Sequence, residues 1–107
     1  MRMTLDVGDE GDARVVRVRG EVDLDTSPSL WAEIERALKA AHHVKVHLLE
    51  VSYMDSSGVA TLIKGLKHAA KSDTKFSLLE PSPRVMAVLD LAQLGPLFVI
   101  ERRETGA

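Results

Sequence analysis

Hydroxyl and carboxylate side chains gather in two short segments of the chain, residues 21–27 and residues 52–58. Such groups can accept a phosphoryl group, act as nucleophiles or bind a cation. Asp, Ser and Thr are also the side chains that accept hydrogen bonds from the free N–H groups where a helix begins. Helix capping therefore accounts for both segments on its own, and a chemical role needs further support.

Nucleophilic catalysis by Ser56 or Ser57 is not favoured by the surrounding sequence. The nucleophile elbow has a glycine two residues before its serine, and neither serine has one. A receiver domain phosphorylated on Asp55 would need an acidic metal-binding pair after the first strand and a late lysine, and the chain has no lysine after Lys75. A histidine could still approach either serine in space. We nevertheless predict that the protein is not an enzyme.

Residue types that hold metals or cofactors are sparse. The chain has no cysteine, which excludes disulfides, thiolate zinc sites and iron–sulfur clusters. The chain has four histidines, which are His42, His43, His47 and His68. Their spacing does not form a metal-binding motif such as H-E-x-x-H. We predict no metal site and no cofactor.

The composition is that of one folded domain. With 107 residues, 45% of them hydrophobic, the chain can build one core and is too short for two of ordinary size. Its net charge of -2, without a long block of one sign, predicts no nucleic-acid partner and no anionic membrane surface. Because no apolar run has the length of a signal peptide or a membrane span, we expect a cytoplasmic protein without direct membrane insertion. We expect residues 1–107 to form a single domain.

Hydrophobic periodicity predicts alternating strands and helices. Alternating and β-branched runs predict strands at residues 3–7, 13–20, 44–51, 76–79 and 97–100. Helical spacing predicts one helix that Ser27 caps and that ends near residues 42–43, a second that starts within residues 55–58, and a third after Pro81-Ser82-Pro83. This order predicts an α/β fold: a mixed sheet of four to five strands with helices packed against it, parallel neighbours, right-handed crossovers and an N-terminal hairpin.

Both polar segments follow predicted strands and lead into predicted helices. In an open α/β sheet, binding and modification sites lie beyond the carboxyl ends of the strands, where such loops meet helix N-termini. The two segments are therefore expected at the same edge of the sheet.

The residues of these segments carry a resemblance to a known family. Met54-Asp55-Ser56-Ser57-Gly58-Val59, with the preceding strand and Gly20-Glu21-Val22-Asp23-Leu24, resembles the STAS-domain anti-sigma factor antagonists of bacteria. Residues 91–98 also resemble the family's passage from the last helix to the last strand, so that nearly the whole chain takes part.

The resemblance implies a protein switched by phosphorylation. In that family, an anti-sigma factor that is itself a serine kinase phosphorylates the Ser or Thr after the motif Asp, and a separate serine phosphatase removes the phosphate. Ser56 would be the acceptor. The surface that meets the kinase would be formed by Glu21, Asp23, Asp55, Ser57 and Gly58. The unphosphorylated protein would bind the kinase and free the sigma factor.

The same resemblance leaves a second function open. Other STAS domains serve as accessory subunits of lipid-transporting ABC assemblies or as scaffolds of stress-signalling complexes, through the same helix-facing surface.

A phosphate at the start of the second helix is expected to accept backbone N–H bonds there and to leave the fold intact. It would repel a partner because Asp55 and Asp23 are already negative.

Three further residues carry expectations of their own. His47 stands where the family often has an acidic residue, and we expect it to pack or hydrogen-bond beside the strand. Gly65 lies within the second helix, where glycine lowers helix stability, which indicates close packing, against a partner for example. Trp31 lies beside the apolar stripe of the first helix, which predicts partial burial at its edge.

Overall fold

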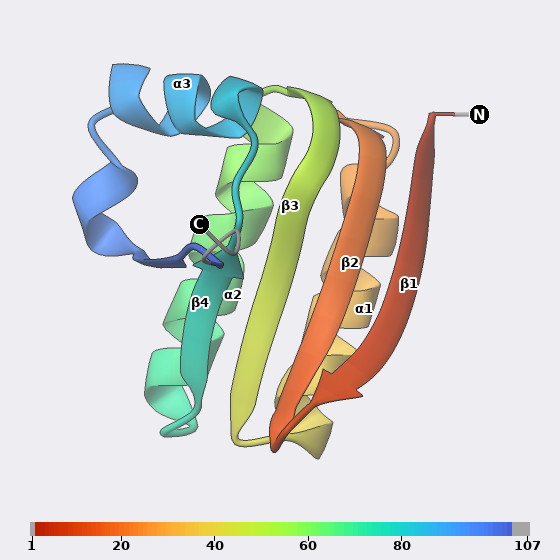
Figure 1. Ribbon diagram of the computed structural model, residues 1–107, viewed down its shortest axis with the longest axis vertical. Helices are drawn as coiled ribbons and strands as arrows, with labels where there is room; N and C mark the ends of the chain where they lie inside the picture. Colours follow the sequence, from red (N-terminus) through yellow and green to blue (C-terminus); the bar gives the residue numbers. More distant parts are fainter. Residues whose placement is uncertain (1, 104–107) are drawn as a thin grey trace.

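The computed structural model describes residues 2–103 and contains five strands and three α-helices within them (Figure 1). Strands and helices alternate after an N-terminal hairpin, as the sequence predicts. In chain order the elements are β1 (Met3–Glu10), β2 (Ala13–Val22), α1 (Ser27–Ala40), β3 (His43–Met54), α2 (Ser56–Lys71), β4 (Lys75–Leu79), α3 (Pro83–Leu91), a short 3-10 helix (Gly95–Leu97) and β5 (Val99–Glu101).

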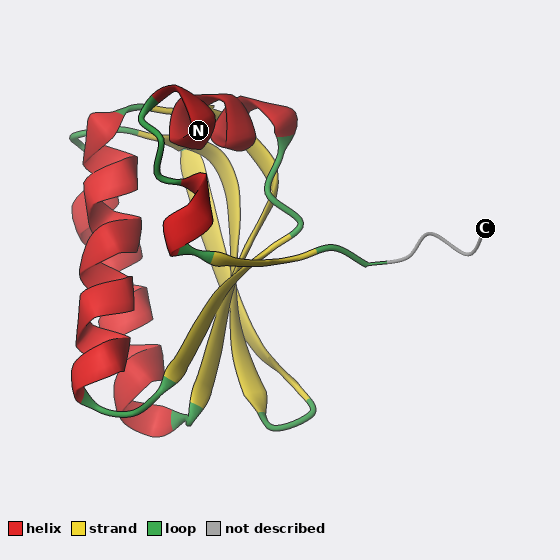
Figure 2. Ribbon diagram, turned by 90° about the vertical axis from the view of Figure 1, so that its left-hand side faces the viewer, coloured by secondary structure: helices red, strands yellow, loops and turns green. Residues whose placement is uncertain are grey.

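The five strands form one mixed sheet in the order β1-β2-β3-β4-β5. β1 pairs with β2 antiparallel, and the other neighbours are parallel. α1 and α2 lie side by side on one face of the sheet, while α3 lies across the end of the sheet where β3 finishes (Figure 2). The opposite face carries no helix within residues 2–103.

Several strand ends differ from those that the sequence predicts. The hairpin turn is confined to Gly11 and Asp12, so β1 continues through residues 8–10, beyond its predicted end at residue 7. The last strand begins at Val99 rather than at Leu97, because the 3-10 helix occupies residues 95–97. Backbone pairing across the hairpin thus extends β1 beyond the residues whose alternating hydrophobicity predicts a strand.

The central strand β3 reaches Met54, three residues past its predicted end. Its pairing with β2 contains two irregularities, after Arg17 and after Gly20, at each of which β3 has one residue more than β2. An extra residue reverses the side-chain alternation of a strand. Leu48, Val51 and Met54 are consequently all buried, despite their spacing of three.

Side chains of the sheet, α1, α2 and α3 share one hydrophobic core. The largest fully buried ones are Leu30, Ile34, Leu48, Leu62, Leu78, Leu89, Val16, Val18, Val22, Val44, Val46 and Val85. Gly65 lets α2 pack closely within this core. A Cβ atom at this position would lie 2.7 Å from Cζ of Phe76, so the close packing is against the chain's own side chain.

The open face of the sheet is held by ion pairs. Arg19 pairs with Glu50 at 2.9 Å, and Lys45 with Glu101 at 2.9 Å. Further pairs join Arg17 to Asp6 and Arg103 to Glu10. The hydrogen bonds from Lys45 and Ser77 lower the pKa of the Glu101 carboxyl, and the hydrogen bond from Arg19 lowers that of Glu50. Charges on this face are therefore largely matched within the protein.

None of the helices within residues 2–103 combines the length and the apolar character that crossing a membrane requires.

Candidate functional site

The two polar segments meet at the carboxyl ends of β2 and β3. Val22 pairs with Met54, and the Asp55 amide donates a hydrogen bond to the Val22 carbonyl at 3.2 Å. This bond ties the last residue of β2 to the residue that starts α2. The two segments therefore form one edge, as their positions after neighbouring parallel strands predicted.

The first segment is organised by Asp23 and Thr26. The Asp23 carboxylate accepts hydrogen bonds at 3.0 Å from the amides of Asp25 and Thr26, and it pairs with Arg2. The Thr26 hydroxyl donates to the Glu21 carbonyl at 2.9 Å. These contacts give the turn into α1 a fixed shape.

The start of α1 differs from the expectation for Ser27. Ser27 is the first helical residue and is buried, while Thr26 holds the capping position without a side-chain capping bond. Thr26 cannot serve as the cap because its hydroxyl is engaged within the turn. The other two helix starts are confirmed: Asp55 caps α2, and Ser82 caps α3 by accepting from the Val85 amide.

Ser56 is exposed at the first residue of α2. Asp55, directly before it, accepts a hydrogen bond from the Ser57 amide at 2.8 Å through its carboxylate. Ser57 itself is half-buried, and its carbonyl accepts a bond at 2.9 Å from Thr61 one turn later. Of the two serines in the motif, Ser56 is thus the one displayed to solvent.

The helix N-terminus offers a phosphate fewer donors than expected. The amides of Gly58 and Val59 both donate to the Asp55 carbonyl, at 3.1 and 3.2 Å, and the Ser57 amide is held by the Asp55 carboxylate. These three amides are not free for a phosphate on Ser56. Such a phosphate would add its charge next to Asp55 and remain outside the helix.

Gly58 lies beneath the site rather than on its surface. A Cβ atom here would lie 2.6 Å from Cγ of Met54 and 2.9 Å from Cγ1 of Val22, the last residues of the two paired strands. Only glycine lets α2 approach both strand ends this closely. Gly58 therefore positions Ser56 against the sheet.

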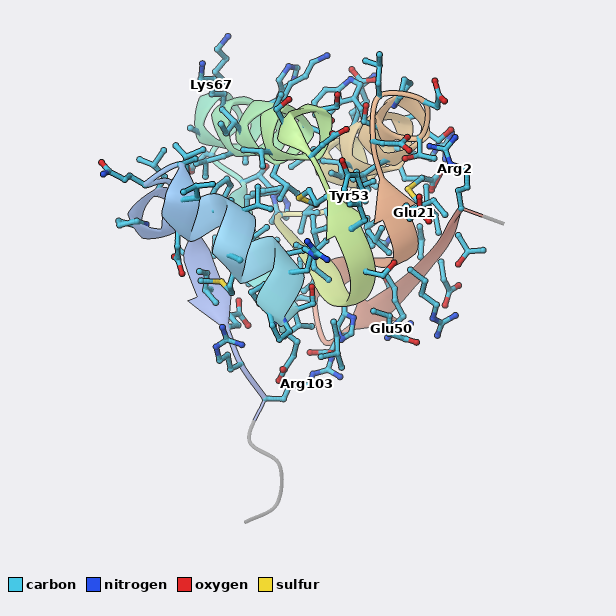
Figure 3. The ribbon with its side chains drawn as sticks, turned by 90° about the horizontal axis from the view of Figure 1, so that it is seen from above. Arg2, Glu21, Glu50, Tyr53, Lys67 and Arg103 are labelled. Carbon is cyan, nitrogen blue, oxygen red and sulfur yellow. The ribbon has the colours of Figure 1, made fainter. Side chains whose placement is uncertain are left out.

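Glu21 and Asp23 differ in how far they can reach a partner. Glu21 is exposed and lies opposite Tyr53 in the strand pairing (Figure 3). The Asp23 side chain is only 17% exposed and pairs with Arg2. Glu21 can contact another protein directly. Asp23 mainly shapes the turn.

Two exposed apolar residues complete this edge and were not singled out from the sequence. Leu24 is 75% exposed and Tyr53 is 42% exposed. Leu24 is an apolar residue between two aspartates and belongs to no apolar face of a strand or helix. This sequence pattern could have indicated that it is exposed. Tyr53 gives no such signal, because its exposure depends on the second irregularity of β3.

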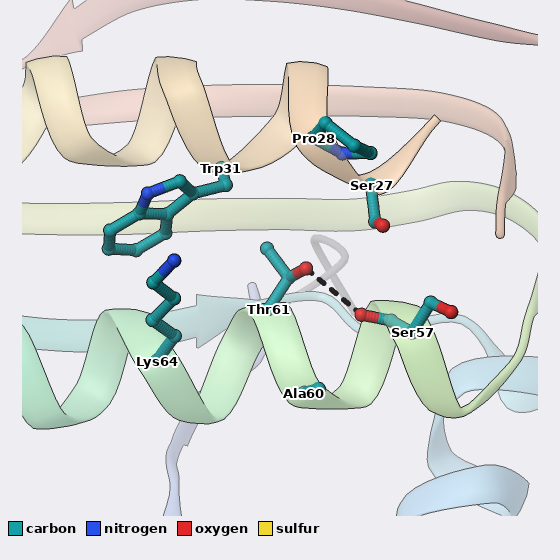
Figure 4. Close-up of a pocket in the computed structure, with 7 residues that line it drawn as sticks. All are labelled: Ser27, Pro28, Trp31, Ser57, Ala60, Thr61 and Lys64. Carbon is teal, nitrogen blue, oxygen red and sulfur yellow. Dashed lines mark hydrogen bonds between the residues drawn. The ribbon is translucent and has the colours of Figure 1, made fainter. Parts of the chain in front are cut away.

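A hollow of about 430 Å³ runs from Ser57 along the groove between α1 and α2 (Figure 4). Trp31 of α1 and Lys64 of α2 close its far end, with the Lys64 ammonium 4.4 Å from the centre of the indole ring. His68 meets the same ring edge-on, with ring centres 4.9 Å apart. Trp31 is half-buried at the edge of the helix pair, as its position beside the apolar stripe predicted.

His47 lies away from this edge, on the open face of the sheet. It is buried as expected, but its Nδ1 has no hydrogen-bond partner within residues 2–103. Burial lowers the pKa of His47, and the nearby charges of Arg17 and Arg103 lower it further, while Glu80 and Glu50 act in the opposite direction. We therefore describe His47 as a packing residue of the sheet.

The lowered pKa of His47 predicts destabilisation by acid. The unfolded chain, in which His47 titrates near its ordinary value, binds the proton more readily than the folded protein below about pH 6.5. The contribution of neutral His47 to the free energy of unfolding is therefore present above that pH and is lost as the pH falls. Replacing His47→Leu should flatten the dependence of the urea midpoint on pH between 8 and 5. Parallel profiles for the two proteins would show that His47 does not contribute.

Comparison with known proteins identifies the family. The family model described as "Mlab, STAS domain" matches residues 5–100. This chain belongs to the STAS domain family. An anti-sigma-B factor antagonist of Staphylococcus epidermidis is 31% identical to this STAS domain over 103 residues, which cover 92% of each chain.

Solved structures of anti-sigma factor antagonists have the same fold as this STAS domain. The protein from Mycobacterium paratuberculosis is 25% identical with a TM-score of 0.84, covering 92% of this chain and 85% of its own. Unphosphorylated SpoIIAA is 25% identical with a TM-score of 0.78, covering 95% and 90%. The Bacillus protein SpoIIAA has also been solved in its phosphorylated form.

Proposed function

We propose that this STAS domain is an anti-sigma factor antagonist that is switched by phosphorylation of Ser56. In its unphosphorylated form it binds an anti-sigma factor that is also a serine kinase, and the sigma factor is thereby released. The observation that carries the proposal is the position of Ser56, exposed at the start of α2 and beside the Asp55 cap, on the edge where β2 and β3 end.

The phosphoryl transfer uses the kinase's chemistry. The Ser56 oxygen attacks the γ-phosphorus of ATP, the bond from that phosphorus to the bridging oxygen breaks, ADP leaves, and the hydroxyl proton passes to a base of the kinase. A serine phosphatase returns the hydroxyl by hydrolysis. This STAS domain contributes an acceptor and a docking surface and no catalytic group. Within residues 2–103, neither motif serine has a hydrogen bond from its hydroxyl to a histidine.

Release follows from charge. A phosphoserine carries about -1.5 to -2 at neutral pH. It would stand directly after Asp55, with Glu21 and Asp25 exposed on the same edge. Since the amides of Ser57, Gly58 and Val59 are engaged by Asp55, they do not neutralise the added charge, which faces the partner.

Mass spectrometry of the intact protein tests the acceptor. After incubation with ATP and each purified anti-sigma kinase of the same genome, the wild-type protein should gain one phosphoryl group. Ser56→Ala should gain none, because its acceptor oxygen is removed. Ser57→Ala should still be modified and serves as the matched control.

Modification of Ser56→Ala at the wild-type rate would place the acceptor elsewhere. If no kinase modifies the wild-type protein, the role as an accessory or scaffold subunit of a lipid-transport or stress-signalling assembly would replace the present proposal.

A further inference from the structure

One face of α2 carries a row of exposed residues that begins at the proposed acceptor. Ser56, Ala60, Lys64, Lys67 and Lys71 are all exposed and follow one another at spacings of four, four, three and four. Residues at these spacings lie on one side of a helix. The row extends over about 22 Å at 1.5 Å per residue, and Lys67 points away from the sheet in Figure 3.

The charge of this row is not matched within the protein. α2 contains three lysines and one histidine and no acidic residue. Lys64, Lys67 and Lys71 form no ion pair within residues 2–103, whereas the arginines and the lysine of the open sheet face are paired with carboxylates. Since the whole chain has a net charge of -2, the free positive charge is a local property of α2.

Two hollows lie beside the row, between α1 and α2. The first is closed by Trp31 and Lys64, and beyond them lies a second hollow of about 500 Å³ lined by Glu35, Leu38, Lys39, His68, Lys71 and Ser72. The indole ring holds the Lys64 ammonium in place. Glu35, the single acidic residue of this lining, forms no ion pair with Lys71 in the described chain.

We propose that the partner which meets Ser56 also lays an acidic segment along α2, with its carboxylates on Lys64, Lys67 and Lys71. The proposal rests on the proposed function, because it assigns this chemistry to the anti-sigma factor. Complementary charge raises the rate of association and fixes the orientation of the partners. The row starts at Ser56, so one continuous surface serves both contacts.

The carboxylates around Ser56 favour an acidic protein segment over a nucleic acid or an anionic membrane. Asp55 directly precedes Ser56 at the upper end of the row, and Glu21 and Asp25 are exposed in the segment that follows the neighbouring strand. An extended polyanion that covered the lysines would also meet these carboxylates. A protein segment can place its acidic residues on the lysines alone and end before Ala60.

The inference is tested by measuring binding of the anti-sigma kinase that phosphorylates the protein. If no kinase phosphorylates it, binding of each anti-sigma kinase of the same genome is measured. The variant Lys64→Glu/Lys67→Glu/Lys71→Glu should bind at least tenfold more weakly at physiological ionic strength, with a slower association rate and a weaker dependence on salt. The control Lys75→Glu/Arg84→Glu/Arg102→Glu makes the same change in net charge at exposed positions outside α2. It should bind within about twofold of the wild type, since at physiological ionic strength charges more than about 8 Å from the partner are largely screened.

The outcomes separate this inference from the phosphorylation switch. Equal weakening by both triple variants, or by neither, would overturn the inference even where Ser56→Asp abolishes binding. Selective weakening by the α2 variant would support it even where Ser56→Asp binds normally. Absence of any kinase complex with the wild type would overturn both proposals, and α2-dependent binding to phosphatidylglycerol vesicles in that case would assign the row to a membrane surface.

Discussion

Replacing Ser56→Asp should weaken binding of the anti-sigma kinase at least about 100-fold, which corresponds to about 2.7 kcal/mol of binding free energy. The substitution adds a permanent negative charge after Asp55, on an edge that already exposes Glu21. Like charges brought together in an interface cost several kcal/mol. Isothermal titration of the purified proteins measures the change directly.

The fold should not change with this substitution. An acidic residue in the first turn of a helix is favourable by about 0.3–1 kcal/mol, so the free energy of unfolding of Ser56→Asp should equal or slightly exceed that of the wild type. The control variant Ala40→Asp adds the same charge at the C-terminal end of α1, far from Ser56. It should bind the kinase with the affinity of the wild type. Comparable affinity of Ser56→Asp and Ser56→Ala would contradict a switch driven by charge.

Replacing Gly20→Ala should lower the free energy of unfolding by about 2–5 kcal/mol, the sum of backbone strain and overpacking. Gly20 has a φ of 96°, which side-chain-bearing residues rarely adopt, and a Cβ atom would contact the backbone carbonyl of Arg2. The same carbonyl accepts a hydrogen bond from Glu21. Displacing Arg2 would also loosen its pairing with Asp23 and Asp25.

Gly8→Ala is the matched control for this effect. Gly8 also lies in the hairpin, but no atom lies within 4 Å of a Cβ placed on it, and its φ is not positive. Its free energy of unfolding should therefore stay within about 0.5 kcal/mol of the wild type. Urea denaturation of the three proteins gives the comparison, and equal midpoints for Gly20→Ala and Gly8→Ala would contradict the strain assigned to Gly20.

The sequence predicts the fold well because local signals and packing agree in each element. The cap-then-proline signal of Ser82-Pro83 marks α3, and the apolar stripe of α2 places Val59 and Leu62 in the core. Strand ends are predicted less well. The lengths of β1 and β3 depend on pairing with β2 and on the two irregularities in that pairing, which no single segment encodes.

For the candidate site, the sequence predicts which segments meet but not which side chains remain free. Asp55 and Ser56 lie where the motif and the strand order indicate. Arg2 pairs with Asp23 across 21 positions of the sequence, so no local pattern reveals this contact. Asp55 binds the helix amides through a backbone geometry that appears only in the folded chain. The lysine row is readable from spacing alone, whereas its lack of ion pairs is a property of the folded chain.

The order of the strands has a consequence for synthesis. Each strand pairs with the one that precedes it in the chain, so a nascent polypeptide leaving the ribosome always finds the neighbouring strand already available. β2, β3, α1 and α2 together bear the acceptor and the lysine row, and all of them precede Ser72. The recognition edge is thus translated before β4, α3 and β5, which add the remaining part of the hydrophobic core.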